Sequence, residues 1–327
     1  METGDCRLCL SEGVLLQNSH FMPRSLYSLF RAGNLHPVRF SREKMAQTSE
    51  QVKEYVFCGD CEKTFNRDGE SWIHRLFATL GGPFPLRDRL LKQAPVEDCG
   101  DVKIFAAAKN PELDVPKLTH FGCGVFFKAA VHPWHGDRGK PYIEMEQNEI
   151  EALRQYLLGK SALPKTMALC VTVDSAPVVW QAMIEPYRAE PLLGFKRYVF
   201  YVPGVFFQLC IGDGVQEKIP TCVNGSLDGL VLHENVSISM RNTGRDELKD
   251  AERPKKLLDM MTDLEKKGLN IRLGDQAGIH MFSGTMSVLA LLFSIASFPY
   301  INYDRRVKLL LHTGRVIGVC LVQTFCY

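Results

Sequence analysis

The chain begins with short segments in which apolar residues cluster or alternate with polar ones. Residues 14–22 read Val-Leu-Leu-Gln-Asn-Ser-His-Phe-Met and predict a strand that ends just before Pro23. Proline disfavours helical backbone at the residue before it, so we expect His20 to lie on extended backbone. Apolar residues at helical spacing predict a helix over residues 24–31, and the run Glu-Tyr-Val-Phe at residues 54–57 predicts a second strand.

A four-residue polar repeat follows the second strand. Apolar side chains at helical spacing accompany polar residues that recur every four positions, namely Glu62, Asn66, Glu70 and His74. This pattern predicts a helix after Cys61 that ends by residues 81–83, Gly-Gly-Pro. Gly69 weakens the prediction, because a glycine inside a helix costs about 1 kcal/mol relative to alanine.

The middle of the chain alternates between proline-rich and apolar segments. Residues 83–116 contain five prolines and mixed charge, so we expect a connector with little regular structure of its own. Residues 118–131 are nearly all apolar and predict a buried element. Their length favours a helix, their Val and Phe content favours a strand, and two glycines leave the choice open. An amphipathic helix is predicted for residues 148–158, with Gly159 as its stop.

Three apolar segments then predict strands of one sheet. They cover residues 167–173, 178–184 and 198–211 and are separated by Asp-Ser and by a spacer over residues 186–194. Residues 225–239 are a candidate for one more strand. Charge-dense residues 245–267 predict a solvated helix.

The C-terminal tail has an unusual composition. Residues 281–301 carry no charge, and a second apolar run covers residues 316–322. A membrane-spanning helix needs about 20 apolar residues, so the length is sufficient. Serine, threonine, glycine and proline lower the hydrophobicity of this segment, however. The composition therefore favours a buried C-terminal helix or an oligomer contact over a membrane span.

Composition narrows the class of protein. The chain has 327 residues, 46% apolar and 23% charged, which excludes wholesale disorder and makes two domains the expected number. A net charge of +2 gives no general preference for nucleic acid, so a nucleic-acid binder would need a local basic patch. The N-terminus has neither the basic nor the apolar region of a secretory signal. We therefore expect a cytoplasmic protein.

Cysteine usage gives the clearest chemical signal. Of the 11 cysteines, four form two Cys-x-x-Cys pairs, Cys6 with Cys9 and Cys58 with Cys61, and the others occur singly. Two such turns brought together supply the four thiolates of a tetrahedral zinc site. An odd count with irregular spacing argues against a disulfide framework and for a reducing compartment. The alternative is a set of buried thiols without metal.

The segment from Cys6 to His74 resembles the HNH, or ββα-metal, nucleases. The likeness covers about 70 residues and rests on Cys6-x-x-Cys9, on Ser-His-Phe-Met-Pro at residues 19–23, and on Cys-Gly-Asp-Cys-Glu-Lys-Thr at residues 58–64. It implies that His20 is the general base and that the zinc has a structural role. The remainder, to about residue 240, is similar to bacterial proteins that pair a Ser-His-x-x-Pro zinc module with an α/β domain, which implies no activity.

The resemblance also implies a catalytic cation beside His20. Magnesium or manganese suits oxygen ligands, and the candidates are Ser19, Glu62, Asn66 and Glu70. Two of them depart from the family pattern, because Ser19 falls where Asp or His is usual and Glu62 falls where a histidine is usual. The alternative for the helix residues is the solvent face of an amphipathic helix, and for His20 a structural role.

Basic residues surround the proposed strand and helix. The candidates for nucleic-acid binding are Arg24, Lys63 and Arg67, with Arg31, Arg39, Arg42 and Arg75 nearby and Tyr27 and Phe40 among them. Clustered cations are what a phosphate track requires. An ordinary solvated face has the same composition.

These patterns predict an α+β protein: a zinc-stapled ββα-metal module over residues 1–82, a connector over 83–116, a mixed α/β domain over 117–278 and an apolar tail over 279–327. The expected function is metal-dependent endonuclease activity on nucleic acid, with DNA as the first candidate. By analogy such modules arm bacterial defence systems, where a second component restrains the nuclease. The expected protein partner is therefore a regulatory protein or a second copy of the chain in a homo-oligomer. The alternatives are a non-catalytic zinc-binding interaction or DNA-binding module and a membrane-associated effector.

Overall fold

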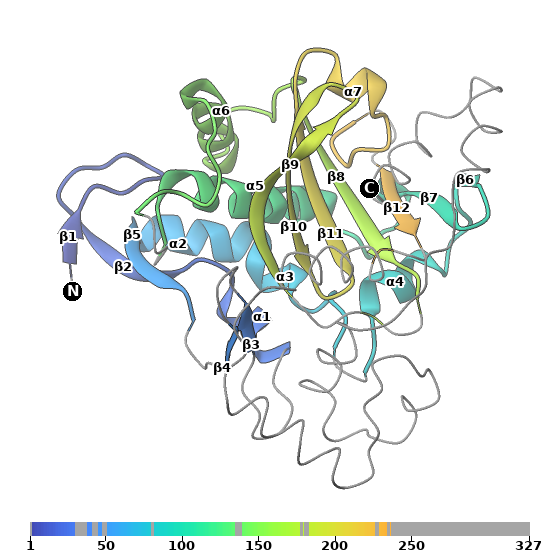
Figure 1. The fold of residues 1–327 in the computed structure, drawn as a ribbon, viewed down its shortest axis with the longest axis horizontal. Coiled ribbons are helices and arrows are strands. Elements are labelled where there is room, and N and C mark those ends of the chain that lie inside the picture. The colour runs from blue at the N-terminus through green and yellow to red at the C-terminus, as the bar shows by residue number, and fades with distance from the viewer. Residues whose placement is uncertain are drawn as a thin grey trace, which may run out of the picture.

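The computed structural model describes residues 2–29, 38–40, 45–47, 51–79, 82–134, 139–176, 179, 183–225, 229–233 and 236. The predictions for residues 245–267 and for the apolar tail lie outside these residues. The described strands form three sheets, with the orders β1-β2-β5, β3-β4 and β6-β7-β12-β8-β11-β10-β9 (Figure 1). The protein is thus a mixed α and β structure whose sheets are largely antiparallel.

The N-terminal elements largely follow the sequence pattern. The strands are β1 (Glu2–Gly4), β2 (Val14–His20), β3 (Val38–Phe40), β4 (Met45–Gln47) and β5 (Lys53–Cys58), and the helix between β2 and β3 is α1 (Arg24–Leu29). β2 pairs with β5 in antiparallel register, so that Leu16 lies opposite Cys58 and His20 lies opposite Lys53. The two predicted strands and the extended backbone at His20 are confirmed.

The helical run after β5 has three parts. They are α2 (Gly59–Phe65), a π-helical turn η1 (Asn66–Glu70) and α3 (Ser71–Ile73). The run begins directly after Cys58, before the predicted start, and its regular part ends at Ile73, well before residues 81–83. A π-helical turn adds one residue to a helical repeat and is frequent at functional sites.

Helix α5 (Val115–Val131) is the centre of the molecule. Asp114 accepts a hydrogen bond from the backbone N–H of Lys117 at 3.0 Å and caps the helix. A helix that is apolar on nearly all sides is expected to be buried, and residues 118–130 of α5 are buried on all sides. It packs between the seven-stranded sheet and the η1 turn, and in Figure 1 it crosses the strands with α2 alongside.

The two glycines that left the choice between helix and strand open for α5 face the layers on either side of the helix. A Cβ at Gly122 would lie 2.8 Å from the Cδ2 atom of Leu169 on the sheet. A Cβ at Gly124 would lie 3.4 Å from the ring of Phe65 on α2. Glycine at 122 therefore lets α5 lie close to the sheet, whereas at 124 a Cβ would make an ordinary contact with α2. The local pattern does not reveal this difference.

The remaining elements of the large sheet correct several expectations. Its strands are β6 (Glu97–Asp98), β7 (Val102–Ala106), β8 (Met167–Asp174), β9 (Ile184–Leu192), β10 (Phe195–Val202), β11 (Val205–Ile211) and β12 (Gly229–His233). The apolar run at residues 198–211 is two strands joined at Pro203 and Gly204, not one. β9 occupies most of the expected spacer at residues 186–194. β12 confirms the candidate strand and is parallel to β8, whereas the other pairs are antiparallel.

The segment expected to be a connector has regular structure. Residues 83–116 include α4 (Pro85–Leu90), β6, β7 and a short 3-10 turn, η2 (Ala107–Lys109). β7 pairs with β12, which lies more than a hundred residues further along the chain, and Leu230 lies opposite Phe105. The local pattern, dominated by prolines, cannot show a pairing partner so distant in sequence. The expectation of little regular structure was therefore wrong.

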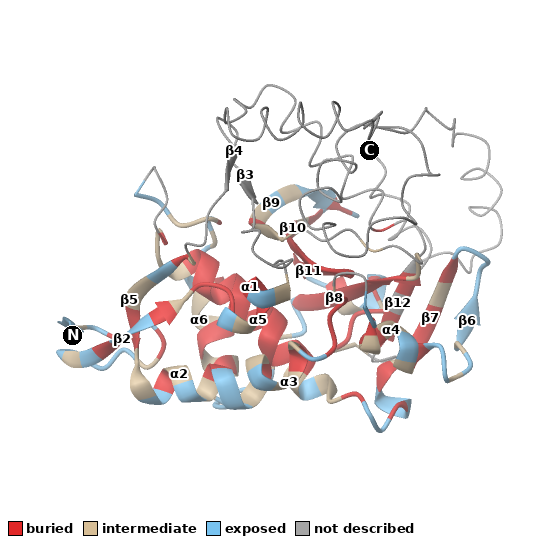
Figure 2. Cartoon of the chain, turned by 90° about the horizontal axis from the view of Figure 1, so that it is seen from below, coloured by how far each residue is buried: buried red, intermediate tan, exposed pale blue. Residues whose placement is uncertain are grey.

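One continuous core joins the N-terminal elements to the large sheet. Phe57 contacts Phe65 with ring centroids 5.1 Å apart, and Phe121 on α5 contacts Phe207 at 5.5 Å. Phe207 in turn stacks on Phe200 at 4.6 Å. Figure 2 shows the buried residues concentrated on α5 and on β8, β10 and β11, whereas β6 is exposed. None of the helices within the described residues combines the length and apolar character needed to cross a membrane.

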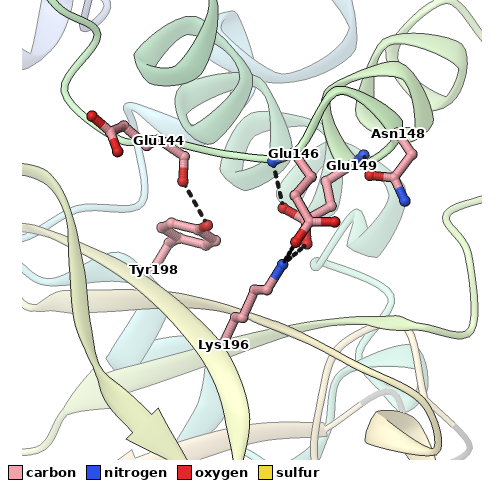
Figure 3. Close-up of polar contacts among 6 residues, drawn as sticks. All are labelled: Glu144, Glu146, Asn148, Glu149, Lys196 and Tyr198. Carbon is pink, nitrogen blue, oxygen red and sulfur yellow. Dashed lines mark hydrogen bonds and ion pairs between the residues drawn. The ribbon is translucent and has the colours of Figure 1, made fainter.

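Helix α6 (Gln147–Leu157) is held against β10 by a polar contact (Figure 3). Glu146 and Glu149 form a capping box at its start. The ammonium of Lys196 on β10 contacts both carboxylates, and these contacts raise the pKa of Lys196 above its ordinary value. Tyr198 donates a hydrogen bond to the carbonyl of Glu144 at 2.8 Å. The start of α6 is therefore tied to the sheet at two points.

Replacing Gly69 by alanine tests the contact between η1 and α5. A Cβ at Gly69 would lie 3.0 Å from the backbone nitrogen of Phe121 and 3.1 Å from its Cα, and backbone atoms cannot rotate away. We expect a loss of about 1–3 kcal/mol in the free energy of unfolding, measured by denaturant titration. The control is Gly124→Ala, where the nearest atom lies at an ordinary 3.4 Å and better helix propensity should leave stability unchanged or higher. Equal effects at both positions would contradict the close approach.

Candidate metal centre

Two turns bring the four paired cysteines together. Cys6 and Cys9 lie in the turn between β1 and β2, where the N–H of Leu10 donates to the carbonyl of Cys6 at 2.9 Å. Cys58 ends β5, and Cys61 lies in the first turn of α2. Because Leu16 lies opposite Cys58 in the β2–β5 pair, both turns meet at the same end of the small sheet.

The sulfur geometry fits a tetrahedral zinc ion. All four ligand atoms lie within 4.8 Å of one another, and the Sγ atoms of Cys9 and Cys58 are 3.8 Å apart. Four sulfurs at about 2.3 Å from a central zinc ion stand about 3.8 Å apart. Cys6 and Cys61 are buried, while Cys9 and Cys58 are partly exposed. The cluster can therefore hold a structural metal ion such as zinc, as the sequence predicts.

Charge in this cluster has to be balanced. A hydrogen bond from the thiol of Cys61 lowers the pKa of Cys6 to about 4. The same contact with Cys6, together with burial, raises the pKa of Cys61 above its ordinary value. The backbone N–H of Cys58 also points at the sulfur of Cys6, at 3.3 Å. A bound dication would stabilise the thiolate form of all four cysteines.

An arginine of α6 holds the first cysteine turn. The Nη1 atom of Arg154 donates to the carbonyl of Leu8 at 3.1 Å, and its Nε and Nη2 atoms donate to Glu151 at 2.6 and 2.7 Å. Arg154 is buried, although it lies in the amphipathic pattern of α6. No sequence motif marks Arg154 as a contact of the cysteine turn. A charged residue beside the apolar Leu153 was the available signal.

His20 lies at the end of β2, away from the cysteines. Its Nε2 atom lies 2.7 Å from the Oε1 atom of Gln51. An amide oxygen only accepts, so Nε2 carries the hydrogen and Nδ1 keeps its lone pair. Burial lowers the pKa of His20 from its ordinary value, and the charges of Lys53 and Lys128 lower it further. The hydrogen bond to Gln51 and the charge of Glu62 oppose this shift. The net effect favours the neutral imidazole.

The four expected cation ligands are in different surroundings. Among the residues that the structure describes, the buried Oε1 atom of Glu62 has no hydrogen-bond partner, whereas the Oε1 atom of Glu70 accepts from the ammonium of Lys128 at 2.7 Å. Ser19 is buried and donates to the carbonyl of Gln17 at 3.3 Å, and Asn66 is exposed. In the part of the chain that the structure describes, the cysteine cluster is the only close group of three or more His, Cys, Asp or Glu ligands. Among the four predicted ligands, Glu62 is thus the one with a buried oxygen that lacks a hydrogen-bond partner within the described residues.

The expected phosphate contacts are exposed side chains. Lys63 pairs with Asp60 at 3.0 Å and Arg67 pairs with Asp68 at 2.5 Å, while Arg24 is exposed on α1. Exposed ion pairs of this kind contribute about 0–1 kcal/mol and can exchange for a phosphate. Arg31 and Arg42 lie outside the described residues, as does the side chain of Arg39.

Three residues that contact His20 or lie opposite it were not predicted from the sequence. Gln51 and Lys53 reach His20 only through the β2–β5 register, and Lys128 reaches it from α5. A buried lysine within the apolar run of residues 118–131 was a usable signal for the last of these. No local signal marks Gln51 or Lys53, because pairing across some thirty residues of chain decides their position.

Comparison with known proteins gives no further assignment: no family model, curated protein or solved structure matches this chain.

Proposed function

We propose that this chain is a zinc-stapled endonuclease that hydrolyses phosphodiester bonds of nucleic acid, with DNA as the first substrate to test. The observation that supports the proposal is the surroundings of His20. Its Nε2 atom donates to Gln51, so the lone pair of Nδ1, which has no hydrogen-bond partner among the described residues, can take a proton from an attacking water. The lowered pKa keeps the ring neutral near pH 7, as a general base requires.

Lys53 and Glu62 extend this chemistry. Lys53 is exposed and lies opposite His20 in the strand pair, so its ammonium can bind a phosphate beside the ring. The Oε1 atom of Glu62 is buried and has no hydrogen-bond partner among the described residues, and we propose that it holds a magnesium or manganese ion, together with water and the substrate phosphate. When bound, such an ion stabilises the negative charge that develops on the phosphate.

Zinc has a supporting role in this proposal. The cysteine cluster joins the start of α2 to the turn before β2, and it thereby sets where Glu62 lies relative to His20. This order of two antiparallel strands and a helix is the reason for retaining the HNH-like interpretation. Restraint by a regulatory partner, assembly into a homo-oligomer, a role in bacterial defence and a cytoplasmic location remain predictions.

Plasmid nicking with the full chain tests the proposal. We expect cleavage with magnesium or manganese, its loss with EDTA, and a rate at least about a hundredfold lower in His20→Ala because a general base contributes 10²–10⁴-fold. The matched control is His74→Ala, because the ring of His74 forms its one hydrogen bond within the described residues with the carbonyl of Glu70 in the preceding turn. This variant should cleave like the wild type. Equal cleavage by wild type and His20→Ala, or none by either, would exclude the proposed mechanism.

The second candidate is a non-catalytic zinc module that binds nucleic acid or another protein. The observation in its favour is that Glu70 is already paired with Lys128, so fewer oxygens are open to a catalytic ion than the family pattern implies. Salt-dependent binding to DNA without cleavage is the result that this alternative predicts.

A further inference from the structure

Lys128 is a buried cation with three partners on the N-terminal elements. It is 1% exposed, although lysine is rarely buried without a partner. Its ammonium donates to the Oε1 atom of Glu70 at 2.7 Å and to the backbone carbonyl of His20 at 3.3 Å. It also lies 4.6 Å from the ring centroid of Phe65. One side chain of α5 thus contacts β2, α2 and η1 together.

We propose that Lys128 is a positioning residue for the His20 centre, so that helix α5 controls the orientation of the histidine. The inference rests on the proposed function. The ammonium is too deeply buried to touch a substrate, so it acts through the peptide that follows His20. Holding that carbonyl fixes the peptide plane at the end of β2, and with it the direction in which the His20 side chain leaves the strand.

Three further contacts hold the segments on either side of the hydrogen bond between Lys128 and His20. The Nε1 atom of Trp134 donates to the carbonyl of Lys128 at 2.6 Å, which holds the last turn of α5. The ring of Trp134 packs against Phe21, the residue after His20, with centroids 5.4 Å apart. The N–H of Phe21 donates to the carbonyl of Val52 at 2.9 Å. The backbone on the C-terminal side of His20 is therefore tied to α5 by one polar contact and one aromatic contact.

A purely structural explanation is that Lys128 only neutralises Glu70. The two explanations differ in what happens when both charges are removed. Breaking a buried pair leaves one uncompensated charge and destabilises the fold, whereas replacing both members is often neutral. Removing Lys128 also deletes the donor to the carbonyl of His20, whether or not Glu70 is changed. Stability and His20 geometry should therefore separate in a double variant.

The experiment compares Lys128→Met, Glu70→Gln and the double variant in the full chain. The matched control is Lys117→Met, the same change on the same helix, where the lysine forms a partly exposed ion pair with Asp114 at 3.2 Å. Thermal unfolding and zinc content report the fold, and the nicking rate reports the site. We expect Lys128→Met to lower both the melting temperature and the rate, and the double variant to regain the melting temperature while its rate stays at least about tenfold low.

Selective ¹³C labelling gives a readout that does not depend on cleavage. The carbonyl resonance of His20 should shift in Lys128→Met and in the double variant, but not in Glu70→Gln or Lys117→Met. Recovery of the rate together with stability in the double variant, or an unshifted resonance in Lys128→Met, would overturn the inference. If the wild type does not cleave, the proposed function fails while the resonance still decides whether Lys128 holds the His20 backbone.

Discussion

Replacing Cys58 by serine is expected to release the bound zinc and to unfold the N-terminal elements. The four sulfurs lie within 4.8 Å of one another, and within the described residues no other close ligand group could take the place of a lost thiolate. Binding of a structural zinc contributes on the order of 10 kcal/mol to small zinc-stabilised folds, so its loss should dominate any other single change. Metal analysis of the purified protein and thermal unfolding are the measurements. We expect zinc to fall from one equivalent to near zero, together with a large drop in melting temperature.

The control for this prediction is Cys99→Ser. Cys99 is an exposed cysteine beside β6 that belongs to no ligand group, so its loss should leave zinc content and melting temperature unchanged. A zinc-selective chelator should also expose the four cluster thiols of the wild type to a thiol reagent. Full zinc occupancy and normal stability in Cys58→Ser would show that the cluster is not the metal centre.

Gly204→Ala is expected to cause the largest loss of stability away from the metal centre. Gly204 follows Pro203 in the turn between β10 and β11 and has a φ of +81°. A Cβ there would lie 2.6 Å from the buried ring of Phe84 and 3.2 Å from Val179. Left-handed backbone costs about 1–2 kcal/mol for a residue with a Cβ, and overpacking typically adds about 1–3 kcal/mol. We expect a total loss of about 4 kcal/mol in the free energy of unfolding.

Gly194→Ala separates the two contributions. Gly194, in the turn between β9 and β10, has a nearly identical φ of +84°, but no atom of the described residues lies within 4 Å of the position that a Cβ would take there. Its substitution should therefore cost only the backbone term, about 1–2 kcal/mol. Denaturant titration of both variants gives the packing contribution by difference. Equal losses would mean that Phe84 moves aside without cost.

Elements with a clear local pattern were predicted close to their observed bounds. β2 and α6 are examples, because an apolar run before proline and a 3.6-residue periodicity are decided by neighbouring residues. The structure of α5 could not be predicted in the same way. Its apolar run is compatible with a buried strand or a buried helix, and only the layers that cover it on both sides distinguish the two. β7 was missed because its partner β12 lies far along the chain.

The candidate site divides along the same line. The cysteine pairs were identified from spacing, because a Cys-x-x-Cys turn is a local structure that already presents two ligands to one point. His20 was identified from its place before Pro23 and from the resemblance to the HNH nucleases. The surroundings of His20 could not be identified in either way. Gln51 and Lys53 depend on strand register, Lys128 on the packing of α5, and the engagement of Glu70 on that same lysine.

The sequence by itself determined that this protein has a cysteine cluster suited to zinc, a strand ending at His20 and a helix that starts at the second cysteine pair. Only the tertiary structure decided which of the proposed ligands has an oxygen without a hydrogen-bond partner among the described residues, and which is already paired with a cation from α5. The physical reason is how far apart along the chain the interacting residues lie. Turns and helical repeats depend on residues a few positions apart, whereas a buried charge is placed by chain segments that meet only when the core forms.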